Sequence, residues 1–403
     1  MITLKNFIST IKRNLYLAAS ILVFALSLAF AASTMGVLGV GNHNEDTSVG
    51  YIYLGGLAES DYETVLVQKV SLWQADAKYQ IVFQGYTHEI NLNLFQFDVS
   101  STLSYLESGE KNQAYFTMNE GNKNLLIDQL ETSFSLEIIV GLDIESLITQ
   151  VMTDIGQLKM FKTYLLSDHL PDMLPTHASN SSLVSNLSIE DINAIIGDDG
   201  LELKIQPKSR FSLLSAMDDM NLTNNQLSII ASGLQKLLRD TPMSNFTFEQ
   251  NYLLPIWAEP GMNVRILQVN QYDFTFYNPL EYEVVIHITS LNNDKLTFKL
   301  DNYPFISTFS SNSSVLTLIP YQVIYVEDET VNETTIGVEI WEETTEDITY
   351  RVLVTAGVNG SIIQYNRTET LLTGETESIR LYEEETMPVN ALYHYYTYLK
   401  DGE

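Results

Sequence analysis

Two segments decide the fold of the middle of the chain: Ile205-Gln-Pro-Lys-Ser-Arg-Phe-Ser-Leu-Leu214 and Asn224-Asn-Gln-Leu-Ser228. A mainly apolar run follows the second segment as far as Leu238. Apolar and charged residues alternate over 201–205, which predicts a strand with one buried face. The apolar run after the second segment supplies residues for a core. Both segments therefore belong to one folded domain in the middle of the chain.

Two further patterns predict that this domain mixes helices and strands and spans residues 189–310. Ser188-Ile-Glu-Asp191 has the form of a capping box and predicts a short helix. Farther on, Phe274 and Phe276 alternate with polar residues, so both belong on one face of a strand. A turn at 278–281 then predicts that the following strand returns beside it as a β-hairpin.

The part of the chain before this domain divides into an α/β module at 48–175 and a Ser- and Asn-rich linker at 176–188. In the module, two β-type runs flank Gln84-Gly85 and predict a hairpin. The clearest helix begins after Asp143, a good N-cap residue. Apolar residues then recur at i, i+3 and i+4 spacing as far as Leu158, which indicates one buried helix face.

The last part, 311–403, predicts an all-β domain. Short β-type runs separated by turns and acidic residues lie at Val323–Val326, Val338–Trp341, Tyr350–Thr355, Ser361–Tyr365 and Ser378–Tyr382. Tyr393, Tyr395 and Tyr396 form an aromatic group near the end, which either stacks on sugar rings or belongs to a terminal strand. The predicted fold class is α+β, with a mixed central domain between an α/β module and an all-β C-terminal domain.

Composition excludes several classes of function. The formal net charge of −30 argues against nucleic acid as a partner, because binding polyphosphate requires clustered Lys and Arg. The absence of cysteine removes disulfides, thiolate metal sites and a Cys nucleophile. The His residues lack the spacing of a metal site, and no acidic loop has the spacing of a calcium site. We therefore expect neither a metal nor another cofactor.

The amino-terminal segment, residues 1–42, predicts a membrane anchor. Lys5, Lys12 and Arg13 precede an apolar stretch from 15 to 40, and a membrane core of ~30 Å requires ~20 such residues. Basic residues remain on the cytoplasmic side, so we expect a single-pass cell-membrane protein whose C-terminal part is extracellular. The alternative is a signal peptide cleaved after Ala29-Phe-Ala31.

Four dispersed segments resemble, in order, those of the VanW family of cell-envelope proteins. Pro207-Lys-Ser-Arg-Phe-Ser212 resembles the family's P-G-E-x-F-S, and Asn225-Gln-Leu-Ser228 resembles C-Q-x-S, which opens a helix. Pro260-Gly-Met-Asn-Val264 resembles P-G-x-D-A, and the segment 273–278 resembles D-x-x-F-x-N with a following strand. The resemblance implies a VanW-like domain at 189–310.

The flanking parts resemble modules that accompany VanW domains. The N-terminal part is similar to the α/β module often labelled peptidoglycan-binding. The similarity lies in Gly55-Gly-Leu57 and Phe97-Asp-Val99, each of which precedes a predicted helix. Gly357-Val-Asn-Gly360, followed by Tyr365-Asn-Arg367, resembles the glycine-containing extracellular β module. The resemblance therefore implies an envelope protein that contacts the cell wall.

The chain departs from the family at the position that carries the chemistry. The Cys of C-Q-x-S is the proposed nucleophile of members that resemble transpeptidases, and here that position is Asn225. An amide has no ionisable proton and is a poor nucleophile, so the chain lacks the group that this route of acyl transfer requires. We expect a non-catalytic pocket formed by Phe211, Ser212, Asn225, Gln226, Ser228 and His287.

These features predict a non-catalytic, membrane-anchored envelope protein that binds or scaffolds the cell wall polymer or another exported protein. One alternative is a divergent acyl-transfer enzyme in which His287 activates Ser212 or Ser228. A second alternative is a structural subunit of a surface assembly.

Overall fold

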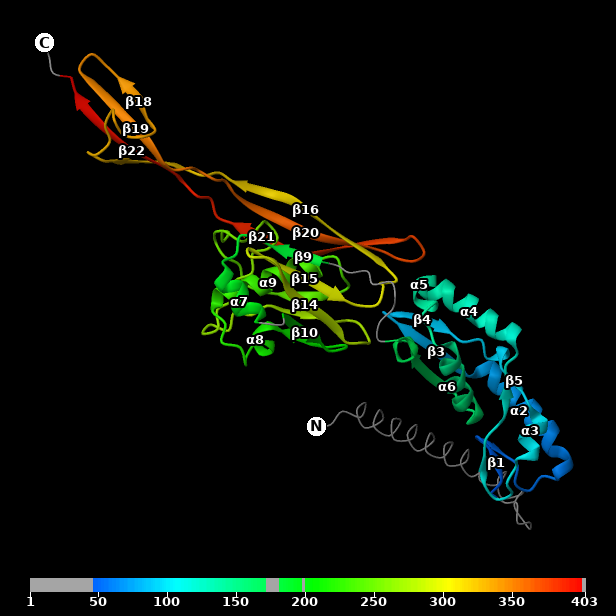
Figure 1. Ribbon diagram of the computed structural model, residues 1–403. Helices are drawn as coiled ribbons and strands as arrows, with labels where there is room; N and C mark the ends of the chain where they lie inside the picture. The colour runs from blue at the N-terminus through cyan, green and yellow to red at the C-terminus, as the bar shows by residue number, and fades with distance from the viewer. Residues whose placement is uncertain (1–45, 172–180, 198–199, 401–403) are drawn as a thin grey trace, which may run out of the picture. The chain divides into compact units, whose positions relative to one another are not determined.

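The computed structural model describes residues 46–171, 181–197 and 200–400, which form two compact units (Figure 1). The first unit contains 46–82, 87–132 and 142–169, and the second contains 83–86, 133–141 and the described residues from Leu170 onward. Helices occur together with several separate sheets, and the C-terminal part is rich in strands. This composition confirms the predicted α+β class, whereas the finer division of the second unit into a central and a C-terminal domain remains a prediction.

The predicted amino-terminal anchor, residues 1–42, lies outside the described residues, as does the beginning of the predicted linker at 176–180. Among the residues that are described, no helix is both long and apolar enough to cross a membrane.

The first unit surrounds a small sheet of order β4-β3-β8. Its strands are β3 (Lys78–Phe83), β4 (Tyr86–Glu89) and β8 (Phe161–Leu165), and its helices are α2 (Tyr62–Asp76), α3 (Val99–Ser104), α4 (Glu120–Phe134) and α6 (Ile144–Gly156). Two smaller sheets contain β1 (Ser48–Val49), β2 (Ile52–Tyr53) and β6 (Lys111–Asn112), and β5 (Gln96–Phe97) with β7 (Phe116–Thr117). The hairpin across Gln84-Gly85 is confirmed. So is the helix after Asp143, whose carboxylate accepts a hydrogen bond from Ser146 N at 3.0 Å.

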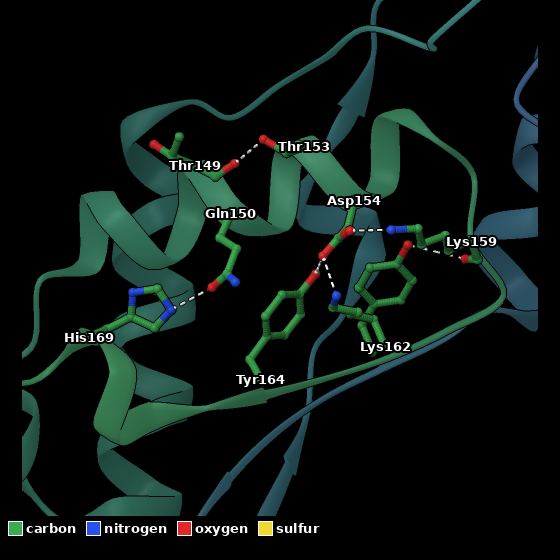
Figure 2. A network of polar contacts seen from close by, with 9 residues as sticks. Thr149, Gln150, Thr153, Asp154, Lys159, Lys162, Tyr164 and His169 are labelled. Atoms are coloured by element: carbon green, nitrogen blue, oxygen red, sulfur yellow. Dashed lines mark hydrogen bonds and ion pairs between the residues drawn. The ribbon is translucent and has the colours of Figure 1, made fainter. Parts of the chain in front are cut away.

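A buried carboxylate links α6 to β8 in this unit (Figure 2). Asp154 on α6 accepts hydrogen bonds from Lys159 Nζ at 2.7 Å and from Tyr164 Oη at 3.1 Å, and its second oxygen lies 3.2 Å from Lys162 Nζ. Burial would raise the pKa of Asp154, but the donors of Lys159, Lys162 and Tyr164 outweigh burial, so its pKa lies below the ordinary value. The charged form of Asp154 therefore stabilises this unit.

The second unit begins with an antiparallel sheet of order β10-β14-β15-β9. Its strands are β9 (Ser181–Val184), β10 (Leu201–Ile205), β14 (Val284–Asn292) and β15 (Lys295–Asp301). Helices α7 (Ile189–Ile196) and α9 (Asn224–Leu238) pack on this sheet. The unit also contains two short helices, α5 (Leu136–Ile139) and α8 (Leu213–Ala216). Gly233 permits α9 to approach closely, because a Cβ built there would lie 2.2 Å from Cζ of the buried Phe298 ring. The predicted strand at 201–205 and the helix after Asn224 are confirmed.

Part of the predicted linker is instead a strand of this sheet. Residues 181–184 form β9, which pairs with β15, and Val184 is fully buried. Ser182 is also buried, and its hydroxyl donates to the carbonyl of Gly233 at 2.8 Å. The linker interpretation is therefore corrected for 181–184, because these residues form a paired strand in which the Ser182 hydroxyl bonds the backbone of α9.

The predicted hairpin after Phe274 is also corrected. Strand β13 (Thr275–Tyr277) belongs to a separate sheet of order β11-β13-β12, with β11 (Arg210–Ser212) and β12 (Ser244–Thr247), whereas the next strand, β14, lies in the sheet under α9. Asn278 explains the change of sheet. Its buried amide donates to the carbonyl of Gln206 at 3.0 Å and accepts from Leu280 N at 3.0 Å, so it stabilises a corner in the chain.

The C-terminal residues form two further sheets, and each predicted β-type run becomes part of a strand (Figure 1). The first has the order β16-β20-β21, with β16 (Thr308–Ile319), β20 (Gly360–Thr370) and β21 (Thr376–Thr386). The second, which we call the terminal sheet, has the order β17-β22-β19-β18, with β17 (Val323–Glu327), β18 (Val338–Glu343), β19 (Asp347–Thr355) and β22 (Ala391–Leu399). The β-rich character predicted for this region is confirmed.

We expect Gly233→Ala to destabilise the second unit. Overpacking against Phe298 costs about 1–3 kcal/mol, and the gain in helix propensity of about 1 kcal/mol offsets part of this. Differential scanning calorimetry of the full chain should show a lowered transition. The control is Gly121→Ala in α4, where the new Cβ meets no core side chain; an unchanged transition for Gly233→Ala would contradict the close approach.

We expect Asp154→Asn to weaken the first unit by about 1–2 kcal/mol, because two partly exposed ammonium groups lose their shared partner. The contribution of the charged form is present above the ordinary Asp pKa of 3.8 and is lost as the pH falls through the lower pKa of the folded state. Hydrogen exchange of the α6 and β8 amides should therefore differ between wild type and variant at pH 6, and converge in strong acid. Asp128→Asn, an exposed carboxylate on α4, should leave exchange unchanged.

Candidate binding site

The structure places Phe211 and Ser212 together on β11 but gives both a structural role. The ring of the buried Phe211 lies 5.0 Å from that of Phe276. The Ser212 hydroxyl caps α8 by accepting from Ser215 N at 3.1 Å, and it donates to Asp273 Oδ2 at 2.6 Å. The hydroxyl of Ser212 therefore joins the start of α8 to Asp273.

Ser212 and Asp273 line an open cavity of about 420 Å³ together with Met217, Asp218 and Gln268. The carboxylate of Asp273 is already satisfied, because Oδ1 accepts from the backbone N–H groups of Leu214 and Phe274. The other predicted pocket residues do not line this cavity.

The first turn of α9 holds the remaining predicted residues of this segment. Gln226 forms a capping box with Thr223, and its Nε2 also donates to Asp191 Oδ1 at 3.0 Å. Asn225 is exposed, and its Oδ1 accepts from Trp257 Nε1 at 3.2 Å. Ser228 is buried, where it donates to the carbonyl of Asn224 at 2.7 Å and accepts from Ile266 N at 2.9 Å.

His287 lies on the other side of the sheet from these residues. Its neighbour Ile288 pairs with Phe298, which faces Gly233 of α9, so the side chain of His287 points away from the helix. There its Nε2 lies 3.0 Å from Asp301 Oδ2, and its Nδ1 lies 3.7 Å from Glu202 Oε2. The structure therefore brings His287 to neither Ser212, Ser228 nor Asn225. In the described part of the chain, no three His, Asp or Glu side chains are arranged to hold a metal ion.

A group of partly exposed aromatic side chains lies on one face of the terminal sheet. The terminal-sheet cluster consists of Tyr325, Trp341, Arg351, Tyr393 and Tyr395. Tyr325 on β17 and Trp341 on β18 come from opposite edges of the sheet, yet their ring centroids are 4.5 Å apart at an interplanar angle of 9°. The two rings therefore meet over the middle strands and span this face of the sheet.

Arg351 organises the centre of the cluster. Its guanidinium carbon lies 5.5 Å from the Trp341 ring centroid and 4.9 Å from that of Tyr393, within the range of cation–π attraction. Its Nε donates to Glu339 Oε1 at 2.6 Å. This charge-assisted hydrogen bond with Glu339 raises the pKa of Arg351, so the guanidinium remains charged between the rings.

Both faces of the terminal sheet leave apolar surface in contact with solvent. Tyr325 and Trp341 are each 41% exposed. On the opposite face, Ile324, Val326 and Ile340 are 40%, 41% and 56% exposed. A sheet normally buries at least one apolar face against another layer, so exposure on both faces indicates an interaction surface.

Sequence reasoning found part of this cluster. Alternation along the last strand puts Tyr393 and Tyr395 on one face and Tyr396 on the other. The pairing of β17 with β22 and of β18 with β19 brings Tyr325 and Trp341 to the same place, and no local pattern in the sequence encodes that pairing.

A buried carboxylate connects β21 to the loop after α9. Glu384 is 1% exposed, and its two oxygens accept from Gly261 N at 2.8 and 3.0 Å. Burial raises the pKa of Glu384 to about 7, although the Gly261 N–H and the charge of Arg239 act in the opposite direction. These hydrogen bonds join β21 to the loop after α9.

Comparison with family models and with curated proteins gives no match for this chain. The resemblance to VanW proteins therefore remains a prediction.

We expect the attachment of β21 to weaken between pH 5 and pH 8. A carboxyl whose folded-state pKa is raised stabilises the fold below its ordinary pKa of 4.5, and this contribution is lost as the pH rises through about 7. Exchange protection of β21 amides, corrected for intrinsic rates, should fall on the order of tenfold. Glu384→Gln should flatten this dependence, whereas Glu385→Gln, at an exposed neighbour, should retain it.

Proposed function

We propose that this chain is a non-catalytic, membrane-anchored envelope protein that binds another exported protein through the terminal sheet. The observation that carries the proposal is the terminal-sheet cluster. Trp, Tyr and Arg are the residues most enriched at the energetic centres of protein interfaces, and here they lie together, partly exposed, on one face.

The geometry of the rings favours a protein over a sugar polymer. Sugar binding by stacking requires a free aromatic face, but Tyr325 and Trp341 cover one another and Arg351 lies over the Trp341 ring. Tyr393 stacks on Tyr325 at a centroid distance of 5.7 Å. Leu353, which pairs with Tyr393, is 46% exposed beside the rings and suits apolar side chains of a partner.

The charges beside the terminal-sheet cluster narrow the class of partner protein further. Glu339, Glu342 and Glu343 on β18 border the cluster in a chain of net charge −30. An apolar centre with an acidic border is complementary to a partner surface with an apolar patch and a basic border. The wall polymer remains the competing partner.

The enzyme alternative has little support from the geometry. The hydroxyls of Ser212 and Ser228 are both engaged in hydrogen bonds within the fold. His287, their only predicted base, projects from the opposite face of the sheet. Activation of either hydroxyl by His287 would require the imidazole within hydrogen-bond reach, and it lies on the far face of the sheet.

The test is capture of envelope proteins by the full chain, compared with Trp341→Ala. We expect the loss of one specific partner by at least about tenfold, the usual effect of a central interface residue. Tyr105→Ala, which removes an exposed aromatic of the first unit, is the matched control and should retain the partner.

Because Trp341 also packs within the cluster, Trp341→Ala alone does not separate the loss of a partner contact from misfolding of the sheet. A second variant makes this distinction. Glu342→Lys lies on the exposed border, and it should reduce affinity for a basic partner without disturbing the rings. Binding that survives both substitutions would contradict the proposal. Binding to purified, protein-free wall polymer that depends on Trp341 would favour the competing partner.

A further inference from the structure

The outer edge of β16 carries no charged side chain, and a register shift between Val315 and Thr317 is the one irregularity in its pairing with β20. Strand β16 is the edge of the β16-β20-β21 sheet, and residues 312–318 are exposed. Between Asp301 and Glu327 the sequence contains no charged residue, although the chain carries 51 Asp and Glu. Proteins usually guard a long edge strand with charges, proline or a covering element, because its unpaired backbone groups recruit other strands.

The opposite edge of the same sheet is guarded in the usual way. Strand β21 carries the charged residues Glu377, Arg380, Glu383 and Glu385. The contrast within one sheet indicates that the neutrality of β16 is not a general property of the surface.

The backbone of β16 is oriented for pairing. The N–H of Ser311 donates to Asp240 Oδ1 rather than to β20. Residues two apart on a strand point their backbone groups to the same side, so the N–H of Ser313 also points away from β20. Asp240 closes the edge at Ser311 and leaves the regular segment 312–315, before the register shift, accessible.

We propose that β16 pairs with β16 of a second copy of this chain, in antiparallel orientation, to form one continuous sheet. Two copies of net charge −30 repel one another, so a stable contact requires surfaces without facing carboxylates. A two-fold contact sets the neutral edge against itself and meets this requirement on both sides. It also places an added strand beside Val315, Leu316 and Leu318, which are 57%, 50% and 64% exposed.

The absence of cysteine permits a direct test on the full chain, kept in mild detergent. We expect Ser314→Cys to give a cross-linked dimer with a short bismaleimide, because position 314 lies within the accessible edge. Ser378→Cys on β21 is the matched control, and it should remain monomeric under the same conditions. Equal cross-linking at both positions would overturn the proposal.

A backbone substitution separates strand pairing from other contacts. Ser313→Pro removes an outward N–H without removing a hydrogen bond to β20, and Ser313→Thr keeps that N–H. Sedimentation velocity should show a dimer for wild type and Ser313→Thr, and at least about tenfold weaker association for Ser313→Pro. Circular dichroism establishes that the proline variant is folded.

Two results would refute the proposal: wild type that is monomeric at every concentration, or a dimer that Ser313→Pro leaves intact. Trp341→Ala should not affect this dimer, so the strand contact and the terminal-sheet partner fail or succeed independently.

Discussion

The close contact between α9 and its sheet holds the second unit together. Gly233 lets the helix backbone lie against Phe298, and the carbonyl of the same glycine accepts the hydroxyl of Ser182 on β9. Gly233 thus fixes both the distance between α9 and the sheet and the position of the edge strand β9. Because a packed core tolerates little change in volume, the sheet, the helix and the segment before them must fold as one element.

The terminal sheet also has an apolar face that must be covered, and it covers this face without a packed helix from the described part of the chain. It has no helix like α9 among the described elements of its own face, and the cluster of Tyr325, Trp341 and Arg351 covers that face instead. Large aromatic rings can cover a narrow sheet from its edges, since each buries considerable area. The result is a stable face that still leaves apolar surface accessible, which is the property a binding surface requires.

Local patterns predicted what local interactions decide. The N-caps at Asp143 and Ser188 and the alternation at 201–205 gave elements that the structure contains. Pairing between distant strands was not predictable, because it depends on which edge is free and not on periodicity. The sheet change at Asn278 and the strand at 181–184 were missed for this reason. Helix α4 was missed because its apolar residues do not form a clear stripe.

The same reasoning explains the outcome at the predicted pocket. Sequence reasoning treats Ser212 and Ser228 as chemically free hydroxyls, whereas a serine near a helix terminus often serves the backbone. Here Ser212 caps α8, and Ser228 bridges α9 to Ile266. Each hydroxyl thus accepts a backbone N–H, while the predicted base, His287, lies on the far face of the other sheet. The hydrogen bonds of Ser212, Asn225 and Ser228 thus join neighbouring elements of the fold, whereas the exposed cluster and the uncharged edge of the C-terminal sheets remain accessible to partners.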